Sequence, residues 1–411
     1  CRFQEFPGEG VTLYGNAPIV DKCYFKSGSG NGVHFSGCIG ARVTSNQFED
    51  LNLDTSIGHP DGAVAWSLGH SDCHVIGNVM LRCMAGVGGL DQALSSHAII
   101  ALNTIRDCIW FGINLGGGIS HITIDTNHIY NCGPTSGGTV VSPSGFNAGP
   151  DRGGIYFENV SGTDIVVKGN KIAGCSVYMS LNTASLRTSV FDNIVDGSLL
   201  IAGNHAKFAG NLITGPFKVA GSKNITISHN LIYAPGNTTD LMLYLYSTAD
   251  YENVDVSHNG IVGGAYGISF GSSVTGLRNV SVDHNNLYDQ TTRGISVGNT
   301  VAALAGLRVN GNSIRVGPSA VAGYSAILAS PAAITIAYNE ISNQGGSAGS
   351  RVAINYTAAS GAGEGGVIKD NIARGPWAAA ISMTDNAGAW AINNIIDSGT
   401  VGSATGNTIS G

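Results

Sequence analysis

Four carboxylates stand out in a chain that is poor in charge. Only 11% of its 411 residues are charged. Asp61 and Asp151 lie in two segments that interrupt a regular sequence pattern, and Asp91 and Glu158 lie at or near the ends of strand-like segments. One carboxyl group can protonate a glycosidic oxygen while a second activates water or attacks the anomeric carbon. These residues therefore predict acid–base cleavage of a glycosidic bond, with the four carboxylates as candidate catalytic groups.

A second enzymatic interpretation uses other residues nearby. β-Elimination from a uronic acid needs a base, for which Arg152, His59 and Tyr156 are candidates, and it needs neutralisation of the substrate carboxylate. A lyase that handles polyanions would show a basic groove or a Ca²⁺ held by carboxylates. Because the chain has only 20 Lys and Arg residues, hydrolysis is favoured over elimination. We expect no cofactor for a hydrolase, and Ca²⁺ only for a lyase.

Aromatic and polar side chains in the same part of the chain predict substrate contacts. Sugar rings present C–H faces to flat aromatic surfaces. Strand alternation places a residue on the outer face when its neighbours Val33, Ile113 or Ile155 point inward. The predicted substrate-binding residues are Trp66, Trp110, Asn114, Tyr156 and His34.

Each candidate also has a structural interpretation. Asp61 precedes Gly62, as a turn residue would, and Asp151 with Arg152 reads equally well as a solvated ion pair. Glu158 directly follows the strand-like "GIYF" and is harder to explain structurally.

A repeated phrase determines the elements that carry these residues. Asparagine, any residue and an apolar residue recur in steps of mostly 18 to 32 residues, and such fixed-period similarity is typical of solenoids. The repeat asparagines are Asn46, Asn78, Asn103, Asn127, Asn170, Asn193, Asn211, Asn230, Asn259, Asn285, Asn312, Asn339, Asn371, Asn394 and Asn407. Cys1 and Cys23 occupy the same position upstream. His229, His258 and His284 each directly precede a repeat asparagine and are expected to be structural.

Two further motifs separate the asparagine phrases. One is glycine followed by alternating apolar residues, as in "GINL" and "GIYF"; the other is a run such as "HITIDTN" or "NITISHN". Short alternating segments rich in Val, Ile and Thr predict strands. We predict an all-β, single-stranded right-handed parallel β-helix of about 15 coils, with three parallel sheets and a ladder of stacked asparagine amides.

This coil pattern resembles that of the pectate-lyase-like β-helix superfamily, which contains polysaccharide-degrading enzymes and phage tailspikes. The resemblance covers nearly the whole chain and implies a carbohydrate-binding face, a polysaccharide or oligosaccharide partner and an extracellular or virion-surface location. It makes a homotrimer plausible. A glycan-binding spike, an adhesin or a structural β-helix without catalysis is the remaining alternative.

The eight cysteines all lie in the first 175 residues. Cys83, Cys108, Cys132 and Cys175 each follow a repeat asparagine by five residues, so they occupy equivalent positions on successive coils. Stacked coils place such positions about 4.8 Å apart, at the short end of the disulfide range. We expect a buried file of thiols. A zinc site is not expected, because no CxxC pair exists and ligands in single file cannot surround a metal.

Two long insertions break the repeat. Residues 49–61 and 133–153 both lead into a glycine–apolar strand, so both are expected to overhang the same sheet. Long insertions in a compact repeat are usually functional. We predict one continuous β-helix domain over residues 1–411, part of a longer chain, with a putative active half at 1–180 and plainer structural coils at 181–411.

Composition excludes several other classes of protein. The net charge is −7, and no basic run could follow a phosphate backbone, so nucleic acid is not an expected partner. No apolar stretch approaches the roughly 18 residues that a membrane span requires.

Overall fold

The computed structural model describes most of the chain. The described residues are 1–53, 62–66, 70–89, 96–133, 153–160, 163–175, 177–220, 223–246, 250–271, 276–297, 306–330, 334–344, 350–357, 366–384, 389–397, 401–403 and 408–410. The chain divides into two compact units, Cys1–Lys207 and Phe208–Gly411. Strand β23 (Lys207–Ala209) contains the boundary between them.

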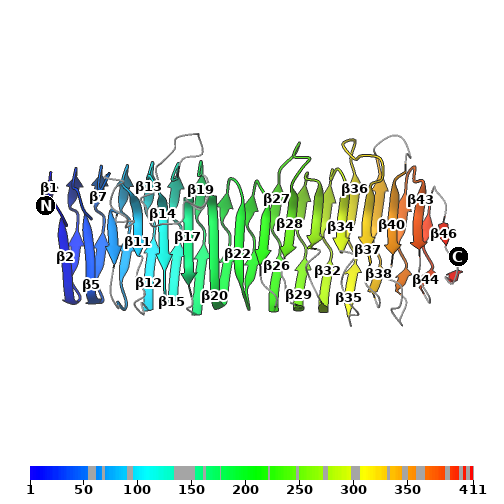
Figure 1. Ribbon diagram of the computed structural model, residues 1–411, viewed down its shortest axis with the longest axis horizontal. Coiled ribbons are helices and arrows are strands. Elements are labelled where there is room, and N and C mark those ends of the chain that lie inside the picture. Colours follow the sequence, from blue (N-terminus) through cyan, green and yellow to red (C-terminus); the bar gives the residue numbers. More distant parts are fainter. Residues whose placement is uncertain are drawn as a thin grey trace. The chain divides into compact units, whose positions relative to one another are not determined.

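Unit 1 is built from coils of three short parallel strands (Figure 1, blue to green). Strands that follow the repeat asparagine form the asparagine sheet: β1 (Arg2–Gln4), β4 (Tyr24–Lys26), β7 (Gln47–Glu49), β10 (Val79–Leu81), β13 (Thr104–Arg106), β16 (His128–Tyr130), β19 (Lys171–Ala173) and β21 (Ile194–Val195). Strands of the glycine motif form the glycine sheet: β2 (Val11–Asn16), β5 (Val33–Ile39), β8 (Val64–Trp66), β11 (Ala85–Gly89), β14 (Phe111–Gly116), β17 (Gly153–Val160), β20 (Val177–Phe191) and β22 (Leu199–Asn204). The third set is β3 (Ile19–Asp21), β6 (Arg42–Thr44), β9 (His74–Ile76), β12 (Ser96–Ala101), β15 (Ser120–Asp125) and β18 (Thr163–Lys168).

Unit 2 repeats the same three sets. Its asparagine sheet comprises β24 (Leu212–Ile213), β27 (Leu231–Tyr233), β30 (Gly260–Val262), β33 (Asn286–Tyr288), β36 (Ser313–Val316), β39 (Glu340–Asn343), β42 (Ile372–Arg374) and β45 (Ile395–Ile396). Its glycine sheet comprises β25 (Phe217–Ala220), β28 (Leu241–Tyr246), β31 (Tyr266–Phe270), β34 (Arg293–Val297), β37 (Ser325–Ala329), β40 (Val352–Thr357), β43 (Ala379–Thr384) and β46 (Val401–Ser403). Its third set comprises β26 (Lys223–Ser228), β29 (Tyr251–Ser257), β32 (Leu277–Asp283), β35 (Leu307–Asn310), β38 (Ile334–Ala337), β41 (Val367–Lys369), β44 (Trp390–Ile392) and β47 (Thr408–Ser410).

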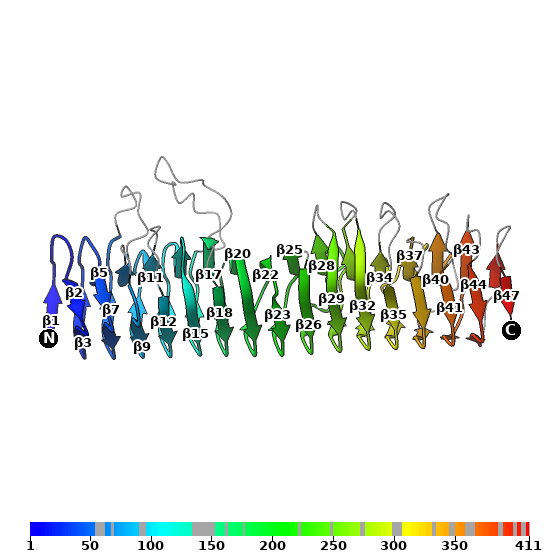
Figure 2. The same cartoon turned by 90° about the horizontal axis from the view of Figure 1, so that it is seen from below.

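The second and third sets are not separate sheets, which differs from the three predicted. In unit 1, the long strand β20 pairs with β17 through Met179 and with β18 through Thr188. It therefore turns the corner without losing strand geometry and joins the two sets into one hydrogen-bonded sheet. Figure 2 shows the third-set strands β9, β12, β15 and β18 following one another along the unit.

Buried asparagines hold successive coils in register within each unit. The Asn103 main-chain N–H and side-chain Nδ2 both donate to Asn127 Oδ1, at 3.0 and 2.9 Å. Asn127 Nδ2 in turn donates to Asn170 Oδ1 at 3.0 Å and to the Ile100 carbonyl at 2.9 Å. The same pattern links Asn211, Asn230, Asn259, Asn285, Asn312, Asn339, Asn371 and Asn394 of unit 2. The predicted asparagine ladder is confirmed.

The residues that flank the ladder are structural, as predicted. His229, His258 and His284 all have φ near 56°. Their exposed imidazole rings stack at centroid separations of 5.0 and 5.2 Å. In unit 1, the Cys23 N–H donates to Asn46 Oδ1 at 2.8 Å, which places Cys23 at the ladder position.

The glycine motif marks the corner between the asparagine sheet and the glycine sheet. A Cβ on Gly112 would lie 2.4 Å from Ile129 Cγ2 and 2.6 Å from the Gly154 carbonyl oxygen. A Cβ on Gly86 would lie 2.5 Å from Ile105 Cγ2. Only glycine leaves room for the central apolar residue of the asparagine strand at this corner.

The predicted file of thiols is also present. Cys83, Cys108, Cys132 and Cys175 are buried and free. Each Sγ lies within hydrogen-bond distance of the carbonyl two residues earlier, for example 3.4 Å from Cys132 to Tyr130. Burial raises the pKa of the Cys83 thiol to about 12, so it stays protonated and packs as an apolar group.

The predicted fold class is therefore confirmed: the chain is an all-β parallel β-solenoid with an asparagine ladder. The described ranges contain no helix, and so none that is long and apolar enough to cross a membrane. Whether the two units form one continuous domain remains a prediction.

Candidate functional site

The candidate site is a row of outward positions on the glycine sheet of unit 1. Register pairs join His34 to Ala65, Ala65 to Gly88, Gly88 to Asn114 and Asn114 to Tyr156. The neighbouring Val33, Ile113 and Ile155 are fully buried in the core. The alternation prediction is thus confirmed for His34, Asn114 and Tyr156, which occupy one row. We call this row the Asn114–Tyr156 face.

Asn114 differs from an ordinary outward residue. Its side chain is only 1% exposed, although β14 places it on the outer side of the sheet. Within the described part of the chain, its Oδ1 has no hydrogen-bond partner. A buried amide oxygen without a partner is rare in proteins, because it loses its bond to water and gains none in return.

Aromatic side chains lie at the start of β14, the strand of Asn114, and on the neighbouring strand β17. The Phe111 and Tyr156 rings stack at a centroid separation of 5.2 Å and an interplanar angle of 16°. Trp110 and Phe111 pack with Met84 and Ala85 in one buried cluster, and the partly exposed Tyr156 ring packs against its edge. Trp110 is 3% exposed, so it supports this cluster and does not present an open ring face.

The predicted catalytic residues are described only in part. Glu158 lies in β17, where its backbone pairs with Gly116 and its position is the next outward one after Tyr156. Its side chain lies outside the described residues. The other candidates, Asp61, Asp91, Asp151, Arg152 and His59, also lie outside them. Their roles stay predictions.

Trp66 is known at the level of its backbone. Its register partner is Phe35, a residue of the core, whereas the outward position of β8 belongs to Ala65. Its predicted contact with substrate stays a prediction.

Both insertions lead into the glycine sheet, as the sequence predicts. The chain enters β8 after residues 49–61 and β17 after residues 133–153. These two strands are separated by β11 and β14. At about 4.8 Å per strand, they are about 14 Å apart. Most of both insertions lies outside the described residues.

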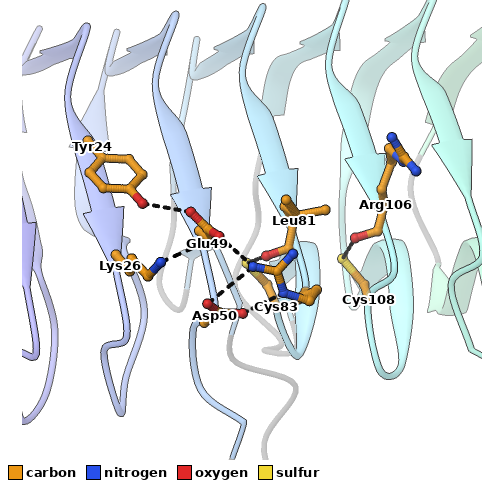
Figure 3. A network of polar contacts seen from close by, with 9 residues as sticks. Tyr24, Lys26, Glu49, Asp50, Leu81, Cys83, Arg106 and Cys108 are labelled. Atoms are coloured by element: carbon orange, nitrogen blue, oxygen red, sulfur yellow. Dashed lines mark hydrogen bonds and ion pairs between the residues drawn. The ribbon is translucent and has the colours of Figure 1, made fainter.

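Sequence reasoning missed a charged network at the start of the first insertion (Figure 3). Tyr24 Oη donates to Glu49 Oε2 at 2.6 Å, and Lys26 Nζ lies 3.6 Å from Glu49 Oε1. Arg82 donates to Asp50 Oδ1 at 2.7 Å and also to Glu49. The Tyr24 hydrogen bond, followed by the Arg82 bond, holds the pKa of Glu49 below its usual range. A carboxylate with a lowered pKa and fixed partners anchors the chain here and is poorly suited to donating a proton.

One contact of that network, between Lys26 and Glu49, could have been found from the repeat itself. Glu49 occupies the position after the central apolar residue of its coil, and Lys26 and Leu81 are its register partners. Alignment of the coils would have placed Lys26 beside Glu49, but the Tyr24 and Arg82 contacts depend on side-chain direction.

Two histidines lie at the N-terminal end of the Asn114–Tyr156 face: His34 in the row and His70 beneath it. His34 Nδ1 is 3.7 Å from Glu9 Oε1, and Asn31 Nδ2 donates to the same Glu9 oxygen at 3.0 Å. His70 is buried beneath this region and accepts a hydrogen bond from the Cys38 N–H at 3.1 Å. Burial lowers the pKa of His70 to about 4, so it is a neutral structural acceptor at neutral pH.

The described residues do not define a metal centre. No group of three or more His, Cys, Asp or Glu side chains among them is arranged to hold a metal ion.

Comparisons with known proteins place the fold in context. No protein-family model matches the chain. No curated protein matches it either. Among solved structures, it is similar to the A-module of mannuronan C-5 epimerase AlgE4 from Azotobacter vinelandii. The TM-score is 0.40 and the identity 11%, over 93% of this chain and 91% of that one.

Proposed function

We propose that the protein binds a polysaccharide across the Asn114–Tyr156 face and cleaves a glycosidic bond there. The supporting observation is the order of groups on β14 and β17. A partly exposed tyrosine ring stacks on Phe111, lies beside the buried Asn114 amide and precedes Glu158 at the next outward position.

The fold suits an extended polymer. Solenoids present long, regular surfaces because each coil repeats the geometry of the last. On this face, an aromatic ring can stack on the apolar side of a sugar while a neighbouring amide bonds its polar edge. On the other side of Asn114, the row continues with Gly88 and Ala65, whose small side chains leave space above the sheet for further sugar residues.

In the proposed reaction, Glu158 donates a proton to the leaving oxygen. A second carboxylate from Asp61, Asp91 or Asp151 then activates water or forms the bond to the anomeric carbon. Tyr156 and Asn114 position the sugar at the cleaved bond, and His34 contacts a more distant sugar residue of the same polysaccharide. An extracellular or virion-surface location and a homotrimer belong to the same proposal.

The test is a screen of polysaccharides followed by variants. Bacterial capsules, O-antigens and plant or algal glycans are incubated with the wild-type protein, and new reducing ends are measured. We expect cleavage of at least one polymer, loss of cleavage in Glu158→Gln, and unchanged cleavage in the matched variant Glu252→Gln of unit 2. Cleavage by Glu158→Gln at the wild-type rate would refute the assignment of Glu158.

The same screen separates the alternatives. Products that absorb near 235 nm carry an unsaturated uronate (the wavelength is approximate and general to that group). Such products would show that the reaction is elimination and not hydrolysis, with Arg152, His59 or Tyr156 as the base. Binding of a polysaccharide without formation of new reducing ends would refute cleavage and would indicate a glycan-binding protein.

A further inference from the structure

The unpartnered oxygen of Asn114 restricts what can bind beside Tyr156. We infer that this position takes an uncharged sugar that donates a hydrogen bond from a hydroxyl or amide N–H, and that Asn114 rejects uronic acids. This inference rests on the proposed function and specifies its substrate class.

The first observation is chemical. Asn114 Oδ1 is an acceptor, it is buried, and no described residue donates to it. A hydroxyl or an amide N–H satisfies such an oxygen. A carboxylate has only acceptor oxygens, so at this position it leaves Asn114 unsatisfied and adds an unpaired charge to a desolvated site.

The second observation concerns charge along the row. Strands β8, β11 and β14 read Val-Ala-Trp, Ala-Gly-Val-Gly-Gly and Phe-Gly-Ile-Asn-Leu-Gly, without a charged residue. The outward positions Ala65, Gly88, Asn114 and Tyr156 are therefore neutral. A surface that binds a uronate normally pairs each carboxylate with Arg, Lys or a metal ion, and these three strands supply none.

The flanking charged groups do not change this conclusion. His34 is the titratable group at the other end of the row, about 14 Å from Asn114 by strand spacing, and it faces Glu9. Glu158, the next outward position after Tyr156, would add negative charge when ionised. Both features favour a neutral sugar over an anionic one beside Asn114.

The apolar surroundings define the shape of the ligand. Phe111 and Tyr156 form one stacked pair, and Asn114 and Tyr156 are partners on adjacent strands. A pyranose that stacks on Tyr156 would therefore have its edge at the height of Asn114. Neutral hexoses and N-acetylhexosamines both offer a donor at that edge, and the experiment separates them.

The experiment measures binding to two matched sets of soluble polymers by affinity electrophoresis. One set is neutral, with hexose and N-acetylhexosamine backbones; the other contains polygalacturonate and alginate. We expect binding within the neutral set, and about tenfold weaker binding in Asn114→Leu, since loss of one buried hydrogen bond changes affinity by roughly that factor. Asn114→Asp keeps acceptor oxygens but adds an unpaired charge to a desolvated site, so it should weaken binding further. Asn114→Ser keeps a neutral acceptor and should weaken binding less.

The control is Asn355→Leu. Asn355 occupies an outward position on β40 in unit 2, and its register partners are Leu328 and Ser382. We expect unchanged affinity in this variant. Circular dichroism and the unfolding midpoint show whether Asn114→Leu is folded; if it is not, Asn114→Ser and Asn114→Asp supply the comparison.

The outcomes are distinguishable from those of the proposed function. A polyuronate that is bound and cleaved, with no effect of Asn114→Asp, overturns the inference and leaves the proposed function standing. Equal binding by wild type and all three Asn114 variants also overturns it. If no polymer of either set binds, both proposals fail.

Discussion

Asn114 and Tyr156 are register partners on β14 and β17, on the outer face of one sheet. They are 42 residues apart in the sequence, with the longer of the two insertions between them. One presents a buried amide oxygen and the other a partly exposed ring. Because parallel strands stack at about 4.8 Å, the two side chains are neighbours, and under the proposed function they contact the same sugar.

Removal of the Tyr156 ring should weaken glycan binding. We expect Tyr156→Ala to lower affinity about tenfold, since stacking adds roughly 0.5–1.5 kcal/mol beyond the area buried. Tyr156→Phe keeps the ring and should lower affinity less than threefold. Titration calorimetry with the polymer found in the screen measures both, and Tyr288→Ala on the asparagine sheet of unit 2 serves as the control. Equal affinity of wild type and Tyr156→Ala would remove Tyr156 from the site.

Loss of one ladder asparagine should destabilise the solenoid strongly. Asn127→Ala leaves the Asn103 N–H without its Asn127 acceptor and removes the Nδ2 donor of the Ile100 carbonyl, whereas Asn170 Oδ1 keeps its bond from the main-chain N–H of residue 127. Buried groups left unpaired cost about 1–3 kcal/mol each, so we expect a loss of at least about 2 kcal/mol in a urea titration. The exposed Asn16→Ala should stay within about 0.5 kcal/mol of wild type. Similar effects of both variants would contradict a structural ladder.

The corner glycine should not tolerate a side chain. Gly112→Ala places a methyl group 2.4 Å from Ile129 Cγ2, and overpacking of this kind costs about 1–3 kcal/mol. Gly8→Ala meets no atom within 4 Å and should be close to neutral. Thermal unfolding of the two variants gives the comparison, and a neutral Gly112→Ala would show that the corner can widen.

The file of cysteines should be unreactive in the native protein. Cys83, Cys108, Cys132 and Cys175 are buried, whereas Cys1 is exposed. We expect a colorimetric thiol reagent to react rapidly with Cys1, more slowly with the partly exposed Cys23, and with all eight cysteines only after denaturation. Fewer than eight thiols in denatured, unreduced protein would indicate disulfides and would contradict the free ladder.

Acid should destabilise unit 1 through His70. Its pKa in the folded protein is about 4, below the ordinary value of 6.5, so the unfolded chain binds the proton first. The contribution of His70 to the free energy of unfolding is therefore fully present above about pH 6.5. It falls as the pH drops from 6.5 towards 4 and does not change further below pH 4. A shift of this size corresponds to about 3 kcal/mol. His70→Gln keeps an acceptor for the Cys38 N–H. In this variant the unfolding midpoint should depend less on pH between pH 6.5 and 4. A parallel pH dependence in both proteins would exclude His70 as the cause.

Much of the fold follows from the repeat. Asparagine, glycine and cysteine recur at equivalent places because each coil imposes the same demands: a buried amide at one corner, no Cβ at the next, and a small apolar group between. The merging of two predicted sheets was not predictable, because it depends on whether β20 keeps strand geometry through a corner.

The sequence by itself determined the solenoid, the ladder, and the outward direction of His34, Asn114 and Tyr156, because period-two alternation and coil period are local properties of the chain. Tertiary structure decided which outward residues are neighbours and how deeply each is buried. Trp110 and Asn114 read as surface groups, but Trp110 is buried in the cluster with Phe111, and Asn114 is only 1% exposed. Burial depends on side chains from other coils, so alternation within one strand could not reveal it.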